Sequence, residues 1–339
     1  MNFRHIKIPY FLVLAFFVSG CSSTVHKDFI ESLVKDSRNN DGSFKSTVVS
    51  LAYNDWGKYL AVGHESGSID IWDAKQRASK REIKAHDYRA NLLAFTSDGS
   101  SFFSNSYFEQ STKLWSATTG ELLHSISDTR GPVCPTLDKH IFLVGQSARF
   151  RMFDLERKML LPEKYETSGV ILVMTMDVAS QQIAIGTASG SIEIWKYLRN
   201  DGNPSFRRML TSKPYDTGNW VVGLQFSTDG TTLYSAARSG VVDGWNTRSL
   251  EKQRAIPTTL KYIHSVANIE GKGLLVLGGT TDPQGLSGGF VEVVDLGPGT
   301  STIYPVNTSL PVVAFIPPLA ALITAQSRSI KVDTLSVND

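Results

Sequence analysis

The fold of this chain is decided by residues 48–73, which read VVSLAYNDWGKYLAVGHESGSIDIWD. The stretch contains three short runs of alternating apolar and polar residues, separated by turns rich in Gly, Asn, Asp and Ser. Such alternation is typical of β-strands, because successive side chains point to opposite faces of a strand. The third run ends in Trp72-Asp73. This stretch therefore predicts three strands joined by tight turns.

The same frame returns along the chain. NLLAFTSDGSSFFSNSYFEQSTKLW ends at Trp115, VMTMDVASQQIAIGTASGSIEIW ends at Trp195, and VVGLQFSTDGTTLYSAARSGVVDGW ends at Trp245. Less similar copies end near Phe153, Val294 and Val332, so successive copies lie 38 to 50 residues apart. Asp98-Gly99 and Asp229-Gly230 fill the first turn of two copies, where hairpins favour Asp-Gly. We count seven repeats, ending near residues 73, 116, 154, 196, 246, 295 and 333.

The period and the terminal Trp resemble WD40 repeats, each of which forms a four-stranded propeller blade. The resemblance implies an all-β, seven-bladed WD40-type β-propeller over residues 28–339. It makes Trp72, Trp115, Phe153, Trp195 and Trp245 structural anchors of their repeats. The usual tetrad of Asp, His, Ser or Thr, and Trp is degraded here: Ser66, Ser189 and Ser239 replace the Asp, and only the second repeat has its His, His86. Trp56 and Trp220, near the first strands of their repeats, are expected to be packing residues.

The last repeat supplies only three expected strands, near 311–316, 320–325 and 329–334. A propeller avoids an exposed sheet edge only when its last blade is completed. Residues 28–34, DFIESLV, precede the first repeat and could pair there. We therefore expect the ring to be closed by an N-terminal strand in the last blade.

The first twenty residues have the pattern of a secretory signal peptide, with Arg4 and Lys7 before the apolar run 8–18. The alternative is a transmembrane helix, but the run is far shorter than the ~20 residues of a membrane span. Residues 18–21, Val-Ser-Gly-Cys, resemble the bacterial lipobox, which implies lipidation of Cys21 and a tether over 21–27. Ser22 and Ser23 then imply an outer-membrane lipoprotein, which we expect to face the periplasm.

Charge and cysteine content narrow the classes of partner. Two of the 34 Lys and Arg precede Cys21, which leaves 32 against 32 Asp and Glu in the remainder of the chain. A neutral chain offers little for nucleic-acid binding, which depends on clustered Lys and Arg. Cys134 would be the remaining thiol, either a reactive group or, as we favour from its apolar neighbours, a buried small hydrophobe. Hydrophobic residues make up 41% of the chain, enough for a packed core.

No catalytic or metal-binding motif emerges from the sequence. The histidines lack ligand spacing such as H-x-H or H-E-x-x-H, so no metal and no cofactor are expected. The Gly-rich stretch 279–289 has no following helix that would present amides to a phosphate, and is interpreted as a long hairpin loop. The expected protein is therefore not an enzyme.

The faces of the ring remain as functional surface. In WD40 propellers the loops between second and third strands share one face with the loops that enter each repeat, and that face commonly docks partners. The aromatic and Arg residues that map there form a candidate partner-binding set: Tyr88, Arg89, Tyr107, Phe108, Arg149, Tyr215, Arg238, Tyr262 and Arg328. Two loops, 104–111 and 278–289, also stand out by length.

We expect a noncatalytic protein–protein interaction scaffold in an envelope assembly, folding or secretion complex. Its partners would be other envelope proteins, together with the membrane through Cys21. The alternative is a propeller enzyme or small-ligand sensor that acts at the central channel.

Overall fold

The computed structural model describes residues 46–54, 59–73, 78–200, 203–269, 273–285, 288–306, 311–316, 321–326 and 329–334. Within these ranges the regular structure consists of β-strands, labelled β1 to β28. The first sheet contains β1 Val48–Asn54, β2 Tyr59–His64, β3 Ser68–Asp73 and β4 Ala78–Lys84. The second contains β5 Leu92–Phe95, β6 Ser101–Ser106, β7 Ser111–Ser116 and β8 Leu122–Ser127. The third contains β9 Val133–Pro135, β10 Ile141–Gly145, β11 Arg149–Asp154, β12 Met159–Leu160 and β13 Tyr165–Glu166.

The next three sheets are each four-stranded, and the last has three strands. They contain β14 Ile171–Asp177, β15 Gln182–Thr187, β16 Ile192–Asn200 and β17 Asn203–Ser212; β18 Val221–Phe226, β19 Thr232–Ala237, β20 Val242–Asn246 and β21 Lys252–Ile256; β22 Tyr262–Ile269, β23 Leu274–Thr280, β24 Gly289–Asp295 and β25 Thr300–Pro305; β26 Val312–Ile316, β27 Ala321–Gln326 and β28 Ser329–Thr334.

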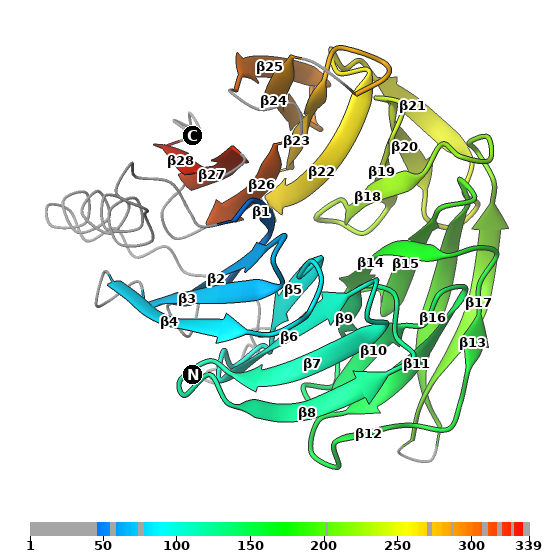
Figure 1. Ribbon diagram of the computed structural model, residues 1–339. Coiled ribbons are helices and arrows are strands. Elements are labelled where there is room, and N and C mark those ends of the chain that lie inside the picture. Colours follow the sequence, from blue (N-terminus) through cyan, green and yellow to red (C-terminus); the bar gives the residue numbers. More distant parts are fainter. Residues whose placement is uncertain are drawn as a thin grey trace, which may run out of the picture.

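Every sheet is an antiparallel meander in which strands neighbour one another in chain order. The one departure is in the third sheet, where β12 and β13 both pair with β11, so its outer strand is divided. The first strands of the sheets contact each other in sequence around a common centre, and the later strands lie progressively outward (Figure 1). This arrangement is a β-propeller, which confirms the expected all-β propeller fold. We number its sheets as blades 1 to 7 in chain order.

The expected number of seven four-stranded blades is wrong for the described residues. Six sheets carry the strands of a complete blade, and the seventh, β26-β27-β28, has three. The sequence placed these three strands correctly, but a repeat counted from its terminal anchor need not be a full blade. The segment that was expected to supply the fourth strand, 28–34, lies outside the described residues.

Hairpin turns and hydroxyl contacts fix how neighbouring blades meet. Gly99 and Gly230 adopt positive φ angles of 69°, as the Asp-Gly turns predict. At the centre, Ser50 of β1 donates its hydroxyl to the carbonyl of Ala90 at 2.5 Å, and Ser265 of β22 donates to Pro311 at 2.7 Å. These two bonds link a first strand to the chain entering the next blade.

The core lies between adjacent blades, in stacked apolar layers. One layer joins Ile69 and Ile71 of blade 1 to Phe102 and Trp115 of blade 2. The five aromatic repeat anchors are all buried in third strands: Trp72, Trp115, Phe153, Trp195 and Trp245. Because neighbours cover both faces of a blade, polar positions of a strand can also be buried, and this shapes the site described below.

Blades 3 and 4 share an aromatic cluster. Phe150 stacks on Tyr165 with ring centroids 5.0 Å apart, and meets Trp195 edge-on at 5.1 Å and Phe206 at 5.6 Å. The unusually long hairpin of β16 and β17 brings Phe206 to this position, and its Arg199 pairs with Asp138 of blade 3 at 2.5 Å. The hairpin therefore covers the place where the outer strand of blade 3 is divided.

Several sequence-based predictions fall on residues that the structure does not describe. These are the signal peptide 1–20, Cys21, the tether 21–27, the strand 28–34 and Arg328. Over the described ranges, no helix has the length and apolar character needed to span a membrane.

Candidate interaction face

One face of the propeller carries the loops between second and third strands together with the connections between blades. We call it the loop face; its described loops include residues 65–67, 85–91, 107–110, 128–132, 146–148, 167–170, 188–191, 213–220, 238–241 and 257–261. The turns between first and second strands and between third and fourth strands lie on the opposite face. This division follows from the meander topology, since consecutive turns alternate between the two ends of a blade.

Exposed large apolar residues gather on the loop face. Of the ten among the described residues, five lie in its loops or next to them: Tyr88, Phe108, Val170, Trp220 and Val241. Four others are on fourth strands at the outer edge, and Val178 is in a turn of the opposite face. Apolar side chains that collect on one face mark an interaction site more often than scattered ones do.

The first aromatic group of the loop face joins blades 1 and 2. Tyr88 is 56% exposed and Phe108 is 65% exposed, and their ring centroids lie 5.9 Å apart. Next to Tyr88, Arg89 forms an exposed ion pair with Glu65 of blade 1. The structure therefore brings three of the predicted partner-binding residues together: Tyr88, Arg89 and Phe108.

A second group joins blades 5 and 6. The Arg238 Cζ atom lies 4.2 Å from the ring centroid of Trp220 and 4.6 Å from that of Tyr262, and Arg238 donates a hydrogen bond to the Tyr262 hydroxyl. Cation–π contacts of this kind position a guanidinium without neutralising it. Trp220, expected to be a packing residue, is 38% exposed and belongs to this surface group instead.

His264 connects the two groups electrostatically. It occupies a bulge of the first strand β22 and is exposed to solvent. Desolvation by the surrounding protein lowers its pKa, and the positive charges of Arg238 and Arg89 lower the pKa further. Arg89, in the connection that enters blade 2, and Arg238 of blade 5 therefore both favour the neutral form of His264 in blade 6.

Tyr215 is a correction to the predicted set. It is 8% exposed, and its hydroxyl hydrogen-bonds Ser235 at 2.8 Å and donates to Asp243 at 3.1 Å. Trp245 donates its indole N–H to the same Ser235 hydroxyl at 2.8 Å. Tyr215 therefore stands in the place of the tetrad His in blade 5 and is a core residue, unavailable to a partner.

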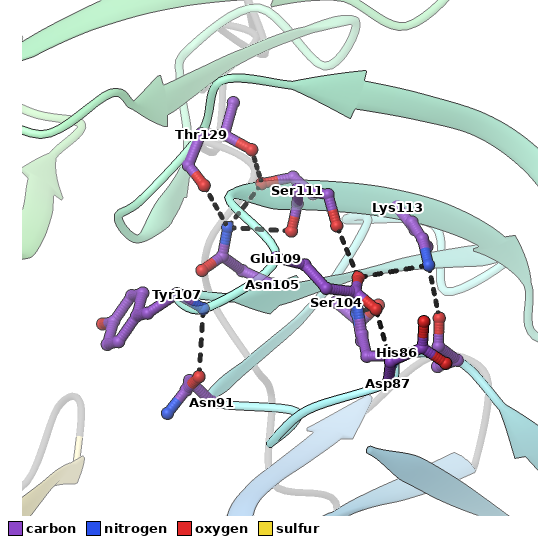
Figure 2. A network of polar contacts seen from close by, with 12 residues as sticks. His86, Asp87, Asn91, Ser104, Asn105, Tyr107, Glu109, Ser111, Lys113 and Thr129 are labelled. Atoms are coloured by element: carbon purple, nitrogen blue, oxygen red, sulfur yellow. Dashed lines mark hydrogen bonds and ion pairs between the residues drawn. The ribbon is translucent and has the colours of Figure 1, made fainter.

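Blade 2 keeps a complete tetrad, with Glu in the place of the usual Asp; Figure 2 shows its His86, Ser104 and Glu109. Trp115 donates to Ser104 Oγ at 2.8 Å, Ser104 contacts His86 Nε2 at 2.7 Å, and His86 Nδ1 contacts Glu109 Oε2 at 2.6 Å. Because a carboxylate can only accept, Nδ1 carries the proton and Nε2 accepts from Ser104. The long loop 104–111, predicted to be functional by its length, thus supplies the acid of this tetrad.

The electrostatics of this tetrad keep His86 neutral and Glu109 charged. Burial lowers the pKa of His86, and the contacts with Glu109 offset only part of that effect. Although partial desolvation opposes it, hydrogen bonds from Asp87 N–H, His86 and Ser111 lower the pKa of Glu109 to about 2. Lys113 adds an ion pair to Glu109 at 3.3 Å and donates to the Ala85 carbonyl at 2.6 Å.

An acid that the sequence reasoning missed lies two residues before the anchor in four blades. Glu193, Asp243 and Glu292 are buried, and Asp70 is partly buried. Glu193 is fully buried and accepts from Trp195 at 2.8 Å and from the Ser168 N–H at 2.5 Å. Glu292 accepts from the Thr259 N–H at 2.8 Å, so in both blades the acid holds the chain that enters the blade.

The remaining candidates of the predicted set lie apart from the two aromatic groups. Arg149 pairs with Asp128 at 3.3 Å on the loop face between blades 2 and 3. Burial raises the pKa of Tyr107 to about 12, and Figure 2 shows its ring turned away from the tetrad. Phe150, next to Arg149 in β11, packs into the core together with Met152 and Phe153.

A metal site is not evident in the described part of the chain. No group of three or more His, Cys, Asp or Glu there could hold a metal ion. A cavity of about 40 Å³ lies between blades 2 and 3, lined by residues such as Leu92, Phe103 and Val133. That volume suits a water molecule rather than a substrate. Burial raises the pKa of the Cys134 thiol to about 12, so this cysteine is an unreactive core residue.

Comparisons with known proteins agree with this description. No protein-family model matches the chain. The chain is 29% identical over 182 residues to a Retinoblastoma-binding protein 5 homolog from Drosophila melanogaster; the match covers 44% of this chain and 37% of that protein. It is 35% identical over 110 residues to Eukaryotic translation initiation factor 3 subunit I from Emericella nidulans; that match covers 31% of this chain and 32% of that protein. A Periodic tryptophan protein 2 homolog from Dictyostelium discoideum is 25% identical over 161 residues, which are 44% of this chain and 17% of that protein.

The chain thus spans about a third or less of the length of these curated relatives. Among solved structures, it is similar to the Cps50 (Swd1) β-propeller domain of Myceliophteria thermophila, with a TM-score of 0.69 and 14% identity over 86% of this chain and 98% of that one. The names describe a binding protein and a subunit of a translation factor. The repeats, the blades and these likenesses together make the chain a β-propeller similar to WD40-repeat proteins.

Proposed function

We propose that this protein is a noncatalytic interaction scaffold whose loop face docks another protein of the bacterial envelope, and that Cys21 anchors it by lipid to the outer membrane. One observation carries the docking role. Half of the exposed large apolar residues in the described chain lie on the loop face, in company with Arg89 and Arg238. Tyr, Trp and Arg are the residues on which binding energy concentrates at protein interfaces.

The envelope address is supported by the sequence alone. The charged and apolar parts of residues 1–20, followed by Val-Ser-Gly-Cys, are the features that the proposal uses. Two or three acyl chains on Cys21 would give stable anchoring, whereas a single chain is marginal. The ring would then present its loop face to partners in the periplasm.

Site-specific photocrosslinking tests the docking role. A photoreactive residue replaces Tyr88 or Phe108 on the loop face, or Val178 on the opposite face, in intact cells. We expect the two loop-face variants to capture the same envelope protein, identified by mass spectrometry, and the Val178 variant to capture none of it. Equal capture from both faces, or capture from Val178 alone, contradicts the assignment.

Fractionation tests the anchor. Cys21→Ala is expected to move the protein from the membrane fraction into the soluble periplasmic fraction after a high-salt wash. Cys134→Ala is the matched control, since that thiol is buried and should leave the distribution unchanged. Retention of the Cys21→Ala variant in the membrane would rule out lipid anchoring.

Closure of blade 7 is a separate proposal on the same chain. We propose that residues 28–34 pair with β28, the outermost described strand of the three-stranded sheet. Phe29 and Leu33 would lie on one face of such a strand, and Ile30 and Val34 on the other, so each face offers apolar side chains. Deletion of 28–34 is expected to lower the melting temperature by several degrees, whereas deletion of 22–27 should not; equal melting of the two variants contradicts the proposal.

A further inference from the structure

We infer that the loop face takes an acidic segment of its partner protein, with one carboxylate of that segment on Arg238. The inference rests on the proposed function, because it names the chemistry of the protein that the same face would dock. It starts from Arg238, which is held in place but forms no ion pair with the described residues.

The guanidinium of Arg238 is positioned by rings rather than by charge. Its Cζ lies 4.2 Å and 4.6 Å from the centroids of Trp220 and Tyr262, and one N–H donates to the Tyr262 hydroxyl. No ion pair joins it to a carboxylate of the described residues. A guanidinium has five N–H donors, so most of them remain available to a ligand.

This arrangement suits a carboxylate. Two N–H groups of a guanidinium edge match the two oxygens of a carboxylate, and the aromatic contacts reduce the side-chain entropy that binding would otherwise cost. Arg89 adds positive potential near Arg238, since both arginines lower the pKa of the same side chain, His264. Arg89 is itself paired with Glu65, so Arg238 is the arginine of this group that is left for an incoming anion.

Other charges on the loop face limit the size of the anion. Glu65 and Asp128 pair with Arg89 and Arg149, and Asp87 and Asp216 lie in the loops of the same face. The face therefore carries both signs of charge instead of the continuous basic surface that suits a nucleic acid. A short acidic segment of a protein can place one carboxylate on Arg238 and lay apolar side chains on Trp220, Tyr88 and Phe108. The exposed rings and the unpaired cation are then used by one ligand.

The test uses the full-length protein in detergent and a fluorescein-labelled decapeptide in which Glu alternates with Leu. A peptide with Gln in place of each Glu is the matched probe, and fluorescence anisotropy gives both affinities. We expect the Glu peptide to bind at least tenfold more tightly. Arg238→Gln should weaken it at least fivefold, and Arg238→Lys nearly as much, because Lys keeps the charge but lacks the planar fork.

Arg248→Gln is the control, because Arg248 is exposed in the β20–β21 turn of the opposite face and its loss changes net charge equally. It should leave the affinity unchanged, and all variants should melt as the wild type does. An equal loss of affinity in Arg248→Gln would show that the peptide binds through overall charge rather than through Arg238, and would overturn the inference. Equal affinity for the two peptides, or no binding of either, overturns it as well, while capture of a partner at Tyr88 or Phe108 would show that the docking role itself still stands.

Discussion

The third strands of blades 2 and 4 both carry an anchor Trp, but the indole N–H of this Trp is hydrogen-bonded differently in the two blades. In blade 2 the indole N–H of Trp115 enters a relay through Ser104 and His86 to Glu109. In blade 4 the indole N–H of Trp195 goes directly to Glu193, two residues earlier on the same strand. The position that is Ser104 in blade 2 is Ile185 in blade 4, as the register of each strand pair shows.

The comparison teaches that a blade can bind the indole N–H of its Trp and hold the entering chain without a fixed tetrad. Glu109 binds the N–H of Asp87, and Glu193 binds the N–H of Ser168. Both backbone groups belong to the connection that enters the blade. Either acid thus connects the third-strand Trp to the previous blade.

Removing Glu193 should have the largest effect on stability. Glu193→Ala leaves the buried indole N–H of Trp195 without its acceptor, and it also removes the acceptor of the partly buried Ser168 N–H and the ion-pair partner of Arg208. Each buried donor left unsatisfied costs about 1–3 kcal/mol, so we expect a loss of about 3 kcal/mol. Urea unfolding followed by circular dichroism measures it, and Glu251→Ala, at the exposed end of β20–β21, is the control. A loss no larger than that of the control would mean that blade 4 does not depend on its acid.

Removing Ser104 tests the relay in blade 2. Ser104→Ala removes the acceptor of Trp115 and the hydroxyl that contacts His86, so we expect a loss of about 2 kcal/mol by the same unfolding measurement. Ser235→Ala is the matched change in blade 5 and should cost a similar amount, because Tyr215 continues that relay. A neutral result in both would show that the relays add nothing to stability.

Trp→Phe substitutions should separate bonded from unbonded indoles. Trp72 is fully buried, and its N–H has no hydrogen-bond partner within the described structure, because Val62 holds the position of Ser104. Trp115→Phe breaks a hydrogen bond and strands its acceptor, whereas Trp72→Phe breaks none. We expect the two losses of unfolding free energy to differ by about 1 kcal/mol, and equal losses would contradict the distinction.

The smallest expected effect is a pH dependence confined to blade 2. Burial lowers the pKa of His86 in the folded state, so the unfolded chain binds more protons below pH 6.5 and the folded state loses stability as pH falls through that value. Glu109, with a pKa of about 2, keeps its charge in this range and loses its contribution only as pH falls below about 4.5. His86→Asn should therefore show a smaller decline in unfolding free energy between pH 7.5 and 5.5 than the wild type; identical declines would show that His86 does not titrate on unfolding.

Much of the propeller was accessible from the period of the sequence, whereas much of the polar detail was not. Terminal Trp residues and Asp-Gly turns located the third strands and first hairpins because those features depend on local chemistry. Glu193 was missed since Ile-Glu-Ile-Trp alternates like a strand with one solvated face. In a propeller, neighbouring blades cover both faces, so the polar position is buried as well.

Tyr215 was misplaced for a related reason. A Tyr in an interblade loop resembles an interface residue. Nothing within its own segment shows that its hydroxyl hydrogen-bonds to Ser235 and Asp243 in the core. Glu109 was hidden in the same way, because its loop departs from the usual spacing of the tetrad acid. Contacts between residues 20 or more positions apart decide both cases, and one sequence does not display them.

The hairpin of β16 and β17 gives the ring an uneven mechanical character. Phe206 packs against the aromatic rings of blade 3, and Arg199 forms an ion pair with Asp138 in a turn of that blade. Blade 3 has only short pieces of its own outer strand, so it borrows its cover from blade 4. We therefore expect blades 3 and 4 to fold and unfold together, although the sequence repeats them as separate units.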